Sequence, residues 1–287
     1  MQIALTATVK LLDSTFPYWC SHHLRFFDTI FLWMDEADEL DSPFLPHNPR
    51  IVVHLGSQDV SRSVHGRFML RQDANSNSAL KLCLERNIEW LCHLDSDELL
   101  YAPSREQLLA ELIAECGQIR FINHEVWPIW EADNPFLSCS VFKVNGRNPF
   151  FHFYGNGKSA VRCGPEVWAR GAHQFIGFSG STKTSQSSVV LHYACATYKV
   201  WLKKYANLGD FPSYWWDDVK SPIRLGFHLA SRDVYLRCVE KNSFVEAEAF
   251  FLEKTLNEDA IPLLKNVGSI AIYHPIVKDP FDTLANP

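Results

Sequence analysis

The stretch EWLCHLDSDELLY, residues 89–101, places three acids directly after a run of apolar and aromatic residues. The run EWLCHL is typical of a buried strand, and apolar residues resume at Leu99. Carboxylates packed against apolar residues are costly unless a cation neutralises them. Because side chains two positions apart point the same way in extended backbone, we expect Asp95 and Asp97 to converge on one cation.

Two such carboxylates favour a hard divalent ion, Mn²⁺ or Mg²⁺. They leave coordination positions open for a substrate diphosphate, so that the metal neutralises a leaving nucleoside diphosphate. The alternative is a solvated acidic loop ahead of the next helix. An EF-hand is excluded because the third acid and the loop glycine are missing. A phosphatase of the haloacid dehalogenase type is disfavoured because Leu99 stands where Thr or Val is required.

The segments around this motif predict an α/β fold. Apolar, β-prone segments alternate with helical patterns, and a polar DANSNS stretch predicts a break in the second helix. The expected strands are 2–10, 28–35, 50–55 and 89–94, and the expected helices are 15–27, 64–86 and 104–116, the last with Ser104 as its N-cap. Such alternation predicts a mostly parallel sheet with helices on both faces, and a ligand site beyond the carboxyl ends of its strands.

The second half of the chain has a different pattern. After residue 126, strand-like pieces joined by turn-rich segments predict a small antiparallel extension, and helical patterns begin near Thr197. We therefore expect a catalytic domain over 1–205 and a helical C-terminal appendage over 206–287, packed on the same domain.

Four segments in sequence order resemble the motifs of GT-A glycosyltransferases, in particular the family 2-like and family 92-like groups. The four segments are VKLLDSTFPYWCSHHLRFFDTIFLWMDEADELD from residue 9, EWLCHLDSDELL from 89, GNGKSAVRCGPEVWARGAH from 155 and LHYACATYKVWLKK from 191. The similarity covers roughly residues 3–206. There are departures: Leu11-Leu12 replaces the Asn-Glu of these groups, at the nucleotide end of the cleft, so the base of the donor stays open.

The resemblance implies a Rossmann-like GT-A domain that transfers a sugar from a nucleoside-diphosphate donor, with UDP as the first choice, to a hydroxyl of a glycan or other acceptor, with inversion. By position in the motifs, it implies that Lys10, Asp35, Asp95, Lys158 and His173 contact the donor. Lys158 follows a glycine-rich turn, so that its ammonium could meet a diphosphate. His192, after an apolar strand, matches a family position and is the expected third metal ligand beside Asp95 and Asp97.

An inverting transfer needs a carboxylate that takes the proton of the acceptor hydroxyl. Glu131, Asp133 and Glu166 lie downstream of the acidic motif and are the candidates for this base. The tryptophan-rich loop that contains Trp130, with parts of the segment after 205 (including Trp215 and Trp216), is expected to shape acceptor choice.

Charge and composition limit the partners. A net charge of −6 and a pI near 6.0 argue against binding to duplex nucleic acid. We expect a cytoplasmic protein, because no signal peptide, anchor or bilayer-spanning segment is evident. Two other functions stay open: a nucleotidyltransferase, disfavoured because TVKLLDST (8–15) lacks the glycine- and arginine-rich loop of that class, and a catalytically silent nucleotide- or sugar-binding module of the same fold.

Overall fold

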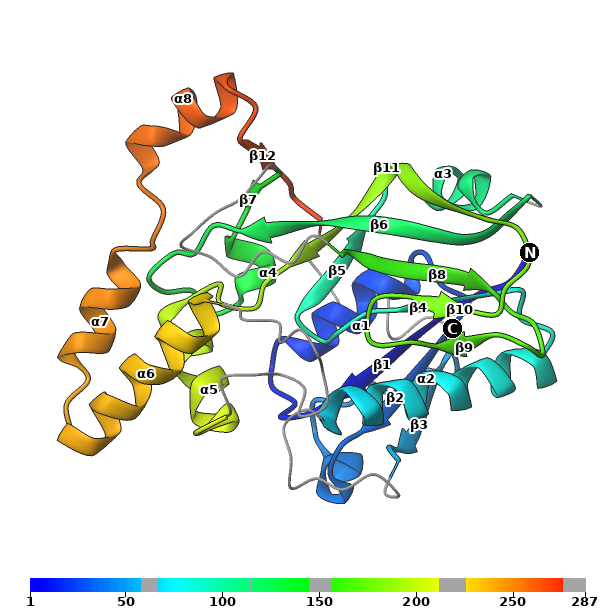
Figure 1. Ribbon diagram of the computed structural model, residues 1–287, viewed down its shortest axis with the longest axis horizontal. Helices are drawn as coiled ribbons and strands as arrows, with labels where there is room; N and C mark the ends of the chain where they lie inside the picture. Colours follow the sequence, from blue (N-terminus) through cyan, green and yellow to red (C-terminus); the bar gives the residue numbers. More distant parts are fainter. Residues whose placement is uncertain (58–66, 114, 145–155, 212–225, 276–287) are drawn as a thin grey trace.

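The computed structural model describes residues 1–57, 67–113, 115–144, 156–211 and 226–275. Within these ranges the chain forms a ten-stranded mixed sheet with helices around it (Figure 1). The strand path is β12-β7-β6-β8-β4-β1-β2-β3, and β11 pairs with both β6 and β5. The strands are β1 (Ile3–Val9), β2 (Thr29–Met34), β3 (Ile51–Leu55), β4 (Trp90–His93), β5 (Glu98–Tyr101), β6 (Cys116–Val126), β7 (Val141–Lys143), β8 (Lys158–Arg162), β11 (Ser181–His192) and β12 (Ile270–Ile272). A separate short hairpin pairs β9 (Trp168–Ala169) with β10 (Phe175–Ile176).

The first half of the sheet is parallel. β1 pairs in parallel with β2 and with β4, and β2 pairs in parallel with β3. All seven residues of β1 are buried, because each face of the strand is covered. The residues Ile3, Leu5, Ala7 and Val9 belong to one apolar core, whereas Ala4 belongs to another on the opposite face.

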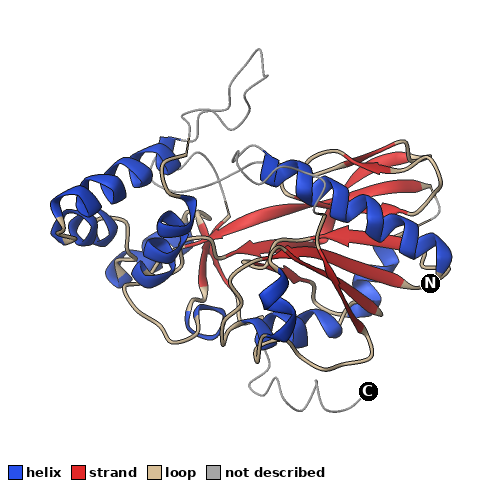
Figure 2. Cartoon of the chain, turned by 90° about the horizontal axis from the view of Figure 1, so that it is seen from below, coloured by secondary structure: helices blue, strands red, loops and turns tan. Residues whose placement is uncertain are grey.

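The helices that cover the two faces are α1 (Phe16–Leu24) and α2 (Arg67–Glu85). Trp19 and Phe16 of α1 pack in the first core, and Ala79 and Leu80 of α2 pack in the second. Figure 2 shows the sheet between helices on its two sides. The shorter helices are α3 (Arg105–Glu111) and α4 (Pro135–Ser138). The Ser104 side chain accepts a hydrogen bond from Gln107 N, so the predicted N-cap of α3 is confirmed.

The antiparallel extension is present. β8 pairs antiparallel with β4 and with β6, and β7 joins β6 to β12. The predicted fold class is therefore confirmed: an α/β sheet with a mostly parallel core, an antiparallel extension and C-terminal helices.

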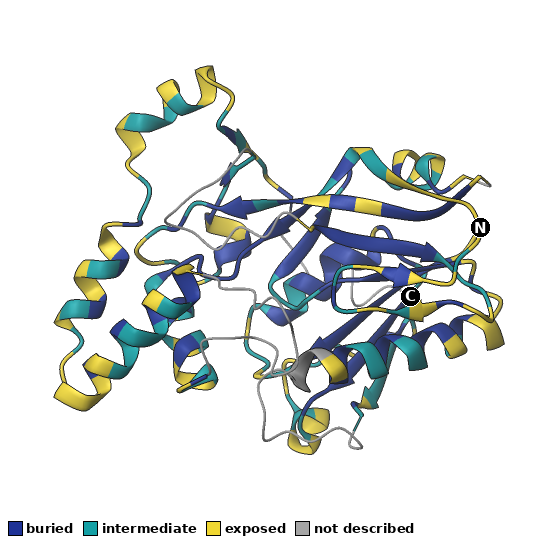
Figure 3. Cartoon of the chain, in the orientation of Figure 1, coloured by how far each residue is buried: buried dark blue, intermediate teal, exposed yellow. Residues whose placement is uncertain are grey.

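The C-terminal helices are α5 (Tyr198–Leu208), α6 (Gly226–Lys241), α7 (Val245–Leu252) and α8 (Ile261–Asn266). A third apolar core, which contains Trp201, Tyr205 and Phe251, holds α5, α6 and α7 together. It begins at Ala194, so the helical unit extends across the predicted boundary at 205. Figure 3 shows the buried strands at the centre and the exposed surfaces of α7 and α8.

The break predicted in the second helix is wrong, since α2 runs from Arg67 to Glu85 without interruption. Its polar residues are used in contacts with other elements. Asn75 donates to Thr8 Oγ1 and accepts from Ser57 N, and Asn77 accepts from Ala169 N. A polar helix face that bonds to neighbouring segments gives the same sequence pattern as a loop.

Candidate active site

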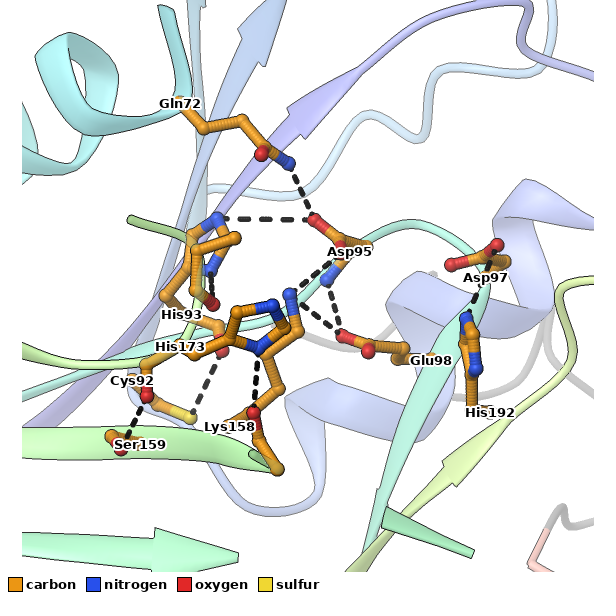
Figure 4. A network of polar contacts seen from close by, with 12 residues as sticks. Gln72, Cys92, His93, Asp95, Asp97, Glu98, Lys158, Ser159, His173 and His192 are labelled. Atoms are coloured by element: carbon orange, nitrogen blue, oxygen red, sulfur yellow. Dashed lines mark hydrogen bonds and ion pairs between the residues drawn. The ribbon is translucent and has the colours of Figure 1, made fainter. Parts of the chain in front are cut away.

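The acidic motif lies in a turn between β4 and β5, at the carboxyl end of the parallel strands. The backbone turns at Ser96 and Asp97 instead of staying extended. The predicted convergence of Asp95 and Asp97 on one point therefore does not form, and each carboxylate faces its own partners (Figure 4).

Asp95 is paired with a buried lysine. The Lys158 ammonium lies 2.6 Å from Asp95 Oδ2 and 3.4 Å from Glu98 Oε2, and none of the Lys158 side chain is exposed. Glu98 Oε2 also accepts from Asp95 N at 2.8 Å, which closes the turn. Burial lowers the pKa of Lys158, but Asp95 and Glu98 outweigh burial and raise it overall. Lys158 therefore neutralises the motif from inside the protein, and the structure does not place it where it could meet a donor diphosphate.

Two further side chains approach Asp95. Gln72 of α2 donates through Nε2 to Asp95 Oδ1 at 2.7 Å. His93 Nε2 lies 4.0 Å from Asp95 Oδ1, while His93 Nδ1 donates to the Ala172 carbonyl. Burial, together with the charge of Lys158, lowers the pKa of His93 to about 4. A neutral His93 contributes little to the charge balance, so Lys158 is the principal counter-charge of Asp95.

Asp97 faces a second set of partners. His192 Nε2 and Lys204 Nζ each lie 3.6 Å from Asp97 Oδ2. On the other side of the ring, His192 Nδ1 is 2.8 Å from Glu125 Oε2. Burial opposes a charge on His192, but Glu125 and Asp97 outweigh it and raise its pKa to about 10. Burial likewise raises the pKa of Asp97, but His192 and Lys204 outweigh it and hold that pKa well below its usual range.

These residues fit a divalent cation only as a partial site. Within the described ranges, no group of three or more His, Cys, Asp or Glu side chains is arranged to hold a metal ion. Asp97 and His192 come nearest, and Glu125 on Nδ1 is the outer carboxylate that metal-ligating histidines commonly have. Asp95 bonds to Lys158 and Gln72 instead, so the predicted set of three protein ligands is not assembled. Oxygens of a ligand would have to complete the coordination.

A cavity of about 910 Å³ opens beside this turn. It lies between the loop after β1, the acidic turn and α5, because the carboxyl ends of the parallel strands β1 and β4 meet at one edge. Of the residues predicted to act, five line it: Lys10, Asp95, Asp97, His173 and His192. Burial and the nearby Lys158 lower the pKa of His173 to about 4, so this ring is neutral.

Asp35 is placed away from the cavity. It is 2% exposed and pairs with Arg71 at 2.9 Å and with Lys10 at 3.7 Å. The predicted contact between Asp35 and the donor is therefore not supported by its position. Its carboxylate instead orients Lys10, which does line the cavity.

The three base candidates also lie outside the cavity lining. Glu131 and Asp133 are exposed in the loop after β6, and Glu166 is exposed between β8 and β9. The carboxylates that do line the cavity, within the residues described, are Asp13, Asp95 and Asp97. The base assignment stays a prediction that the structure does not support.

Sequence reasoning missed Gln72, Glu125 and Lys204. Gln72 and Lys204 lie on helices whose contact with the motif depends on tertiary packing, so the sequence carries no local signal for them. Glu125 is a buried acid in β6, and a buried acid needs a partner. The sequence does not tell which residue that partner is, and the structure shows that it is His192.

Trp130 is stacked on Tyr198 with ring centroids 4.8 Å apart, and its edge meets Phe251. It does not line the cavity, while Trp215 and Trp216 lie outside the described residues. We expect Trp130→Ala to lower the free energy of unfolding by about 1–2 kcal/mol, because stacking and apolar burial are lost. Donor and acceptor use should fall only in proportion to the folded fraction. Chemical denaturation measures the stability change, and a selective loss of acceptor use in a fully folded variant would restore the predicted acceptor role.

Comparisons with known proteins support a distant relationship to glycosyltransferase-like proteins. No protein-family model matches the chain. Two Arabidopsis thaliana proteins are similar in sequence: Glycosyltransferase-like At2g41451 is 26% identical over 192 residues, and Glycosyltransferase-like At3g57200 is 28% identical over 192 residues. Each alignment covers 57% of this chain, but only 42% and 37% of the respective relatives. The chain thus spans less than half the length of these relatives.

Solved structures give remote likenesses. TarS residues 1–349 from S. aureus match at a TM-score of 0.36 and 12% identity, over 93% of this chain and 78% of that one. The 4-diphosphocytidyl-2C-methyl-D-erythritol synthase from Anaerococcus prevotii matches at 0.33 and 15% identity, over 56% of this chain and 71% of that one. No helix in the parts of the chain that the structure describes is long and apolar enough to cross a membrane. By sequence, the chain is distantly related to plant glycosyltransferase-like proteins.

Proposed function

We propose that this protein is a glycosyltransferase that moves a sugar from a nucleoside-diphosphate donor to a hydroxyl acceptor. The observation that carries the proposal is the acidic turn at the carboxyl end of β4, which opens into a cavity rich in cationic side chains. The distant relationship to glycosyltransferase-like proteins supports the same reaction class. UDP as the nucleotide and inversion at the anomeric carbon belong to the proposal as well.

The charges of the cavity suit a diphosphate. In a chain of net charge −6, the described lining contains three Asp and five Lys or Arg residues. Lys10 approaches from the loop after β1, and Lys203 and Lys204 approach from α5. These three ammonium groups are proposed to bind the donor diphosphate and to stabilise the charge that develops on it as it leaves.

Asp97 and His192 are proposed to hold a divalent cation, Mn²⁺ or Mg²⁺, together with oxygens of the donor. A bound cation would act as a Lewis acid toward the leaving diphosphate. The protein prepares this pair through Glu125, which fixes the orientation of the His192 ring. Imidazole nitrogen suits Mn²⁺ better than Mg²⁺, so Mn²⁺ is the expected ion.

Asp95 has a different proposed role. Its carboxylate is held on one side by Lys158 and on the other by Gln72. The Gln72 Oε1 atom is buried and has no hydrogen-bond partner within the described residues, and Gln72 lines the cavity. The Asp95 carboxylate and Gln72 Oε1 are therefore proposed to accept hydrogen bonds from hydroxyl groups of the donor.

Calorimetric titration with UDP tests the proposal. We expect UDP to bind with Mn²⁺ present and to bind at least tenfold more weakly after EDTA treatment, since the cation joins the diphosphate to Asp97 and His192. UDP-sugars should be hydrolysed slowly in the absence of acceptor. As a control for removal of an acid elsewhere on the protein, Glu240→Gln, at an exposed residue of α6, should change neither UDP binding nor UDP-sugar hydrolysis.

The outcomes separate the alternatives. UDP binding with no donor hydrolysis for any UDP-sugar in a panel would indicate a silent binding module. Failure of every nucleoside diphosphate to bind, with or without Mn²⁺, would contradict the proposal itself. Equal UDP affinity with Mn²⁺ and with EDTA would contradict the proposed metal site but not the proposed sugar transfer.

A further inference from the structure

One part of the cavity is lined by residues that come from neither the acidic turn nor the loop after β1. It lies over one face of β6, β8 and β11, against the turn of residues 170–174. Arg120 on β6 is paired with Ser159 on β8, and Ser159 Oγ donates to the His173 carbonyl at 2.7 Å. The side chain of Gln118, two residues before Arg120, bonds to Thr182 Oγ1 at 3.2 Å and accepts from Phe175 N at 2.7 Å. The strands and the turn therefore enclose one polar surface.

This surface carries two arginines without a carboxylate partner. Lys10, Lys203 and Lys204 each lie within 4.0 Å of an acidic side chain. Arg120 donates only to Thr184 Oγ1, at 3.3 Å, and the Arg170 side chain makes no hydrogen bond or ion pair within the described ranges. The part of the lining supplied by β6, β8, β11 and the 170–174 turn contains no Asp or Glu among its described residues.

Two such guanidinium groups favour an anionic ligand. A guanidinium presents a planar set of N–H donors that matches the oxygens of a carboxylate or a phosphate. Both arginines are exposed and line the cavity, so their guanidinium groups are open to a ligand there. The surrounding Gln118, Ser159 and Thr182 are uncharged, and therefore do not compete for the arginines.

We propose that the acceptor is acidic, and that Arg120 and Arg170 bind a carboxylate or phosphate group on it. This inference rests on the proposed transferase function. The donor diphosphate is assigned to lysines from the β1 loop and α5, whereas these arginines come from β6 and from the turn before β10. The cavity thus has a set of lysines for the leaving diphosphate and a separate pair of arginines for the acceptor, and the two sets come from different structural elements.

Binding of matched sugar probes tests the acceptor assignment. The probes are methyl β-D-glucuronide, glucose 6-phosphate and neutral methyl β-D-glucoside, titrated by calorimetry into the full chain with UDP and Mn²⁺ present. At least one charged probe should bind about tenfold more tightly than the neutral probe, since charge-assisted hydrogen bonds are stronger than neutral ones. Comparison of the uronide with the phosphate ester identifies which anion the site prefers.

Arg120→Ala and Arg170→Ala should each remove most of that preference and leave UDP affinity unchanged. The matched control is Lys183→Ala, which removes an exposed positive charge from β11 outside the cavity lining. No preference for either charged probe in the unchanged protein would overturn the proposal, as would the same loss in Lys183→Ala. A loss of UDP affinity in the arginine variants would also overturn it, because the arginines would then serve the donor. Failure of UDP to bind the unchanged protein would instead count against the proposed function.

Discussion

Replacing Lys158 with methionine should lower the free energy of unfolding by about 3–5 kcal/mol. The ammonium is fully buried and lies between Asp95 and Glu98, so its removal leaves two carboxylates without their shared counter-charge. Methionine has nearly the same length, which separates the loss of charge from the loss of volume. Urea denaturation at neutral pH measures the change, and the matched control is Lys183→Met on the exposed side of β11, which should change stability by less than about 0.5 kcal/mol.

Two further measurements distinguish charge from packing in this variant. The deficit should shrink as the pH falls, since burial already raises the pKa of Glu98 and protonation removes its uncompensated charge. A double variant, Lys158→Met with Glu98→Gln, should recover part of the lost stability for the same reason. A deficit that is the same at all pH values, with no recovery in the double variant, would show that Lys158 acts only by filling space.

The fold followed from local patterns because each strand of the parallel half carries its own signal. β1 is buried on both faces and its sequence is apolar and β-prone, and the helices after it have apolar spacing. The error in α2 has a definite cause. Its polar residues Asn75 and Asn77 bond to other elements, and a single sequence does not distinguish such a face from a loop.

The site was harder to predict because its partners are set by tertiary contacts. The acidic motif was found from its position after an apolar run, but the turn at Ser96 could not be read from it. Lys158 follows a glycine-rich turn and Lys204 lies in a helical pattern, but neither context tells which acid the ammonium pairs with. The sheet buries one beneath Asp95, and α5 brings the other to the cavity wall beside Asp97.

These placements divide the two acids of the motif by role. Asp95, whose side chain is 30% exposed, pairs with the fully buried Lys158 next to the buried Glu98, and its charge is balanced within the protein. Asp97 is 36% exposed and lies beside His192 and Lys204, and all three residues line the cavity. The two aspartates should therefore respond differently to the same substitution, and that difference tests the proposed chemistry.

Asp97→Asn should reduce sugar transfer or donor hydrolysis by about 10²–10⁴-fold in the folded protein. It should also lower stability at neutral pH, because His192 and Lys204 hold the pKa of Asp97 well below its usual range. The amide keeps the shape of the side chain but removes the charge that faces His192 and Lys204, so the proposed cation loses its carboxylate ligand. Asp95→Asn is the matched comparison, and it should cost less turnover, because the Asp95 carboxylate bonds to Lys158 and Gln72 and not to the proposed cation. Steady-state release of UDP from a UDP-sugar with Mn²⁺, together with urea denaturation of both variants, gives the two quantities. Near-normal turnover in Asp97→Asn would mean that the acids of the turn serve only the fold. Equal losses of turnover in the two folded variants would mean that both carboxylates serve the cation and the leaving diphosphate, and that the division between them is wrong.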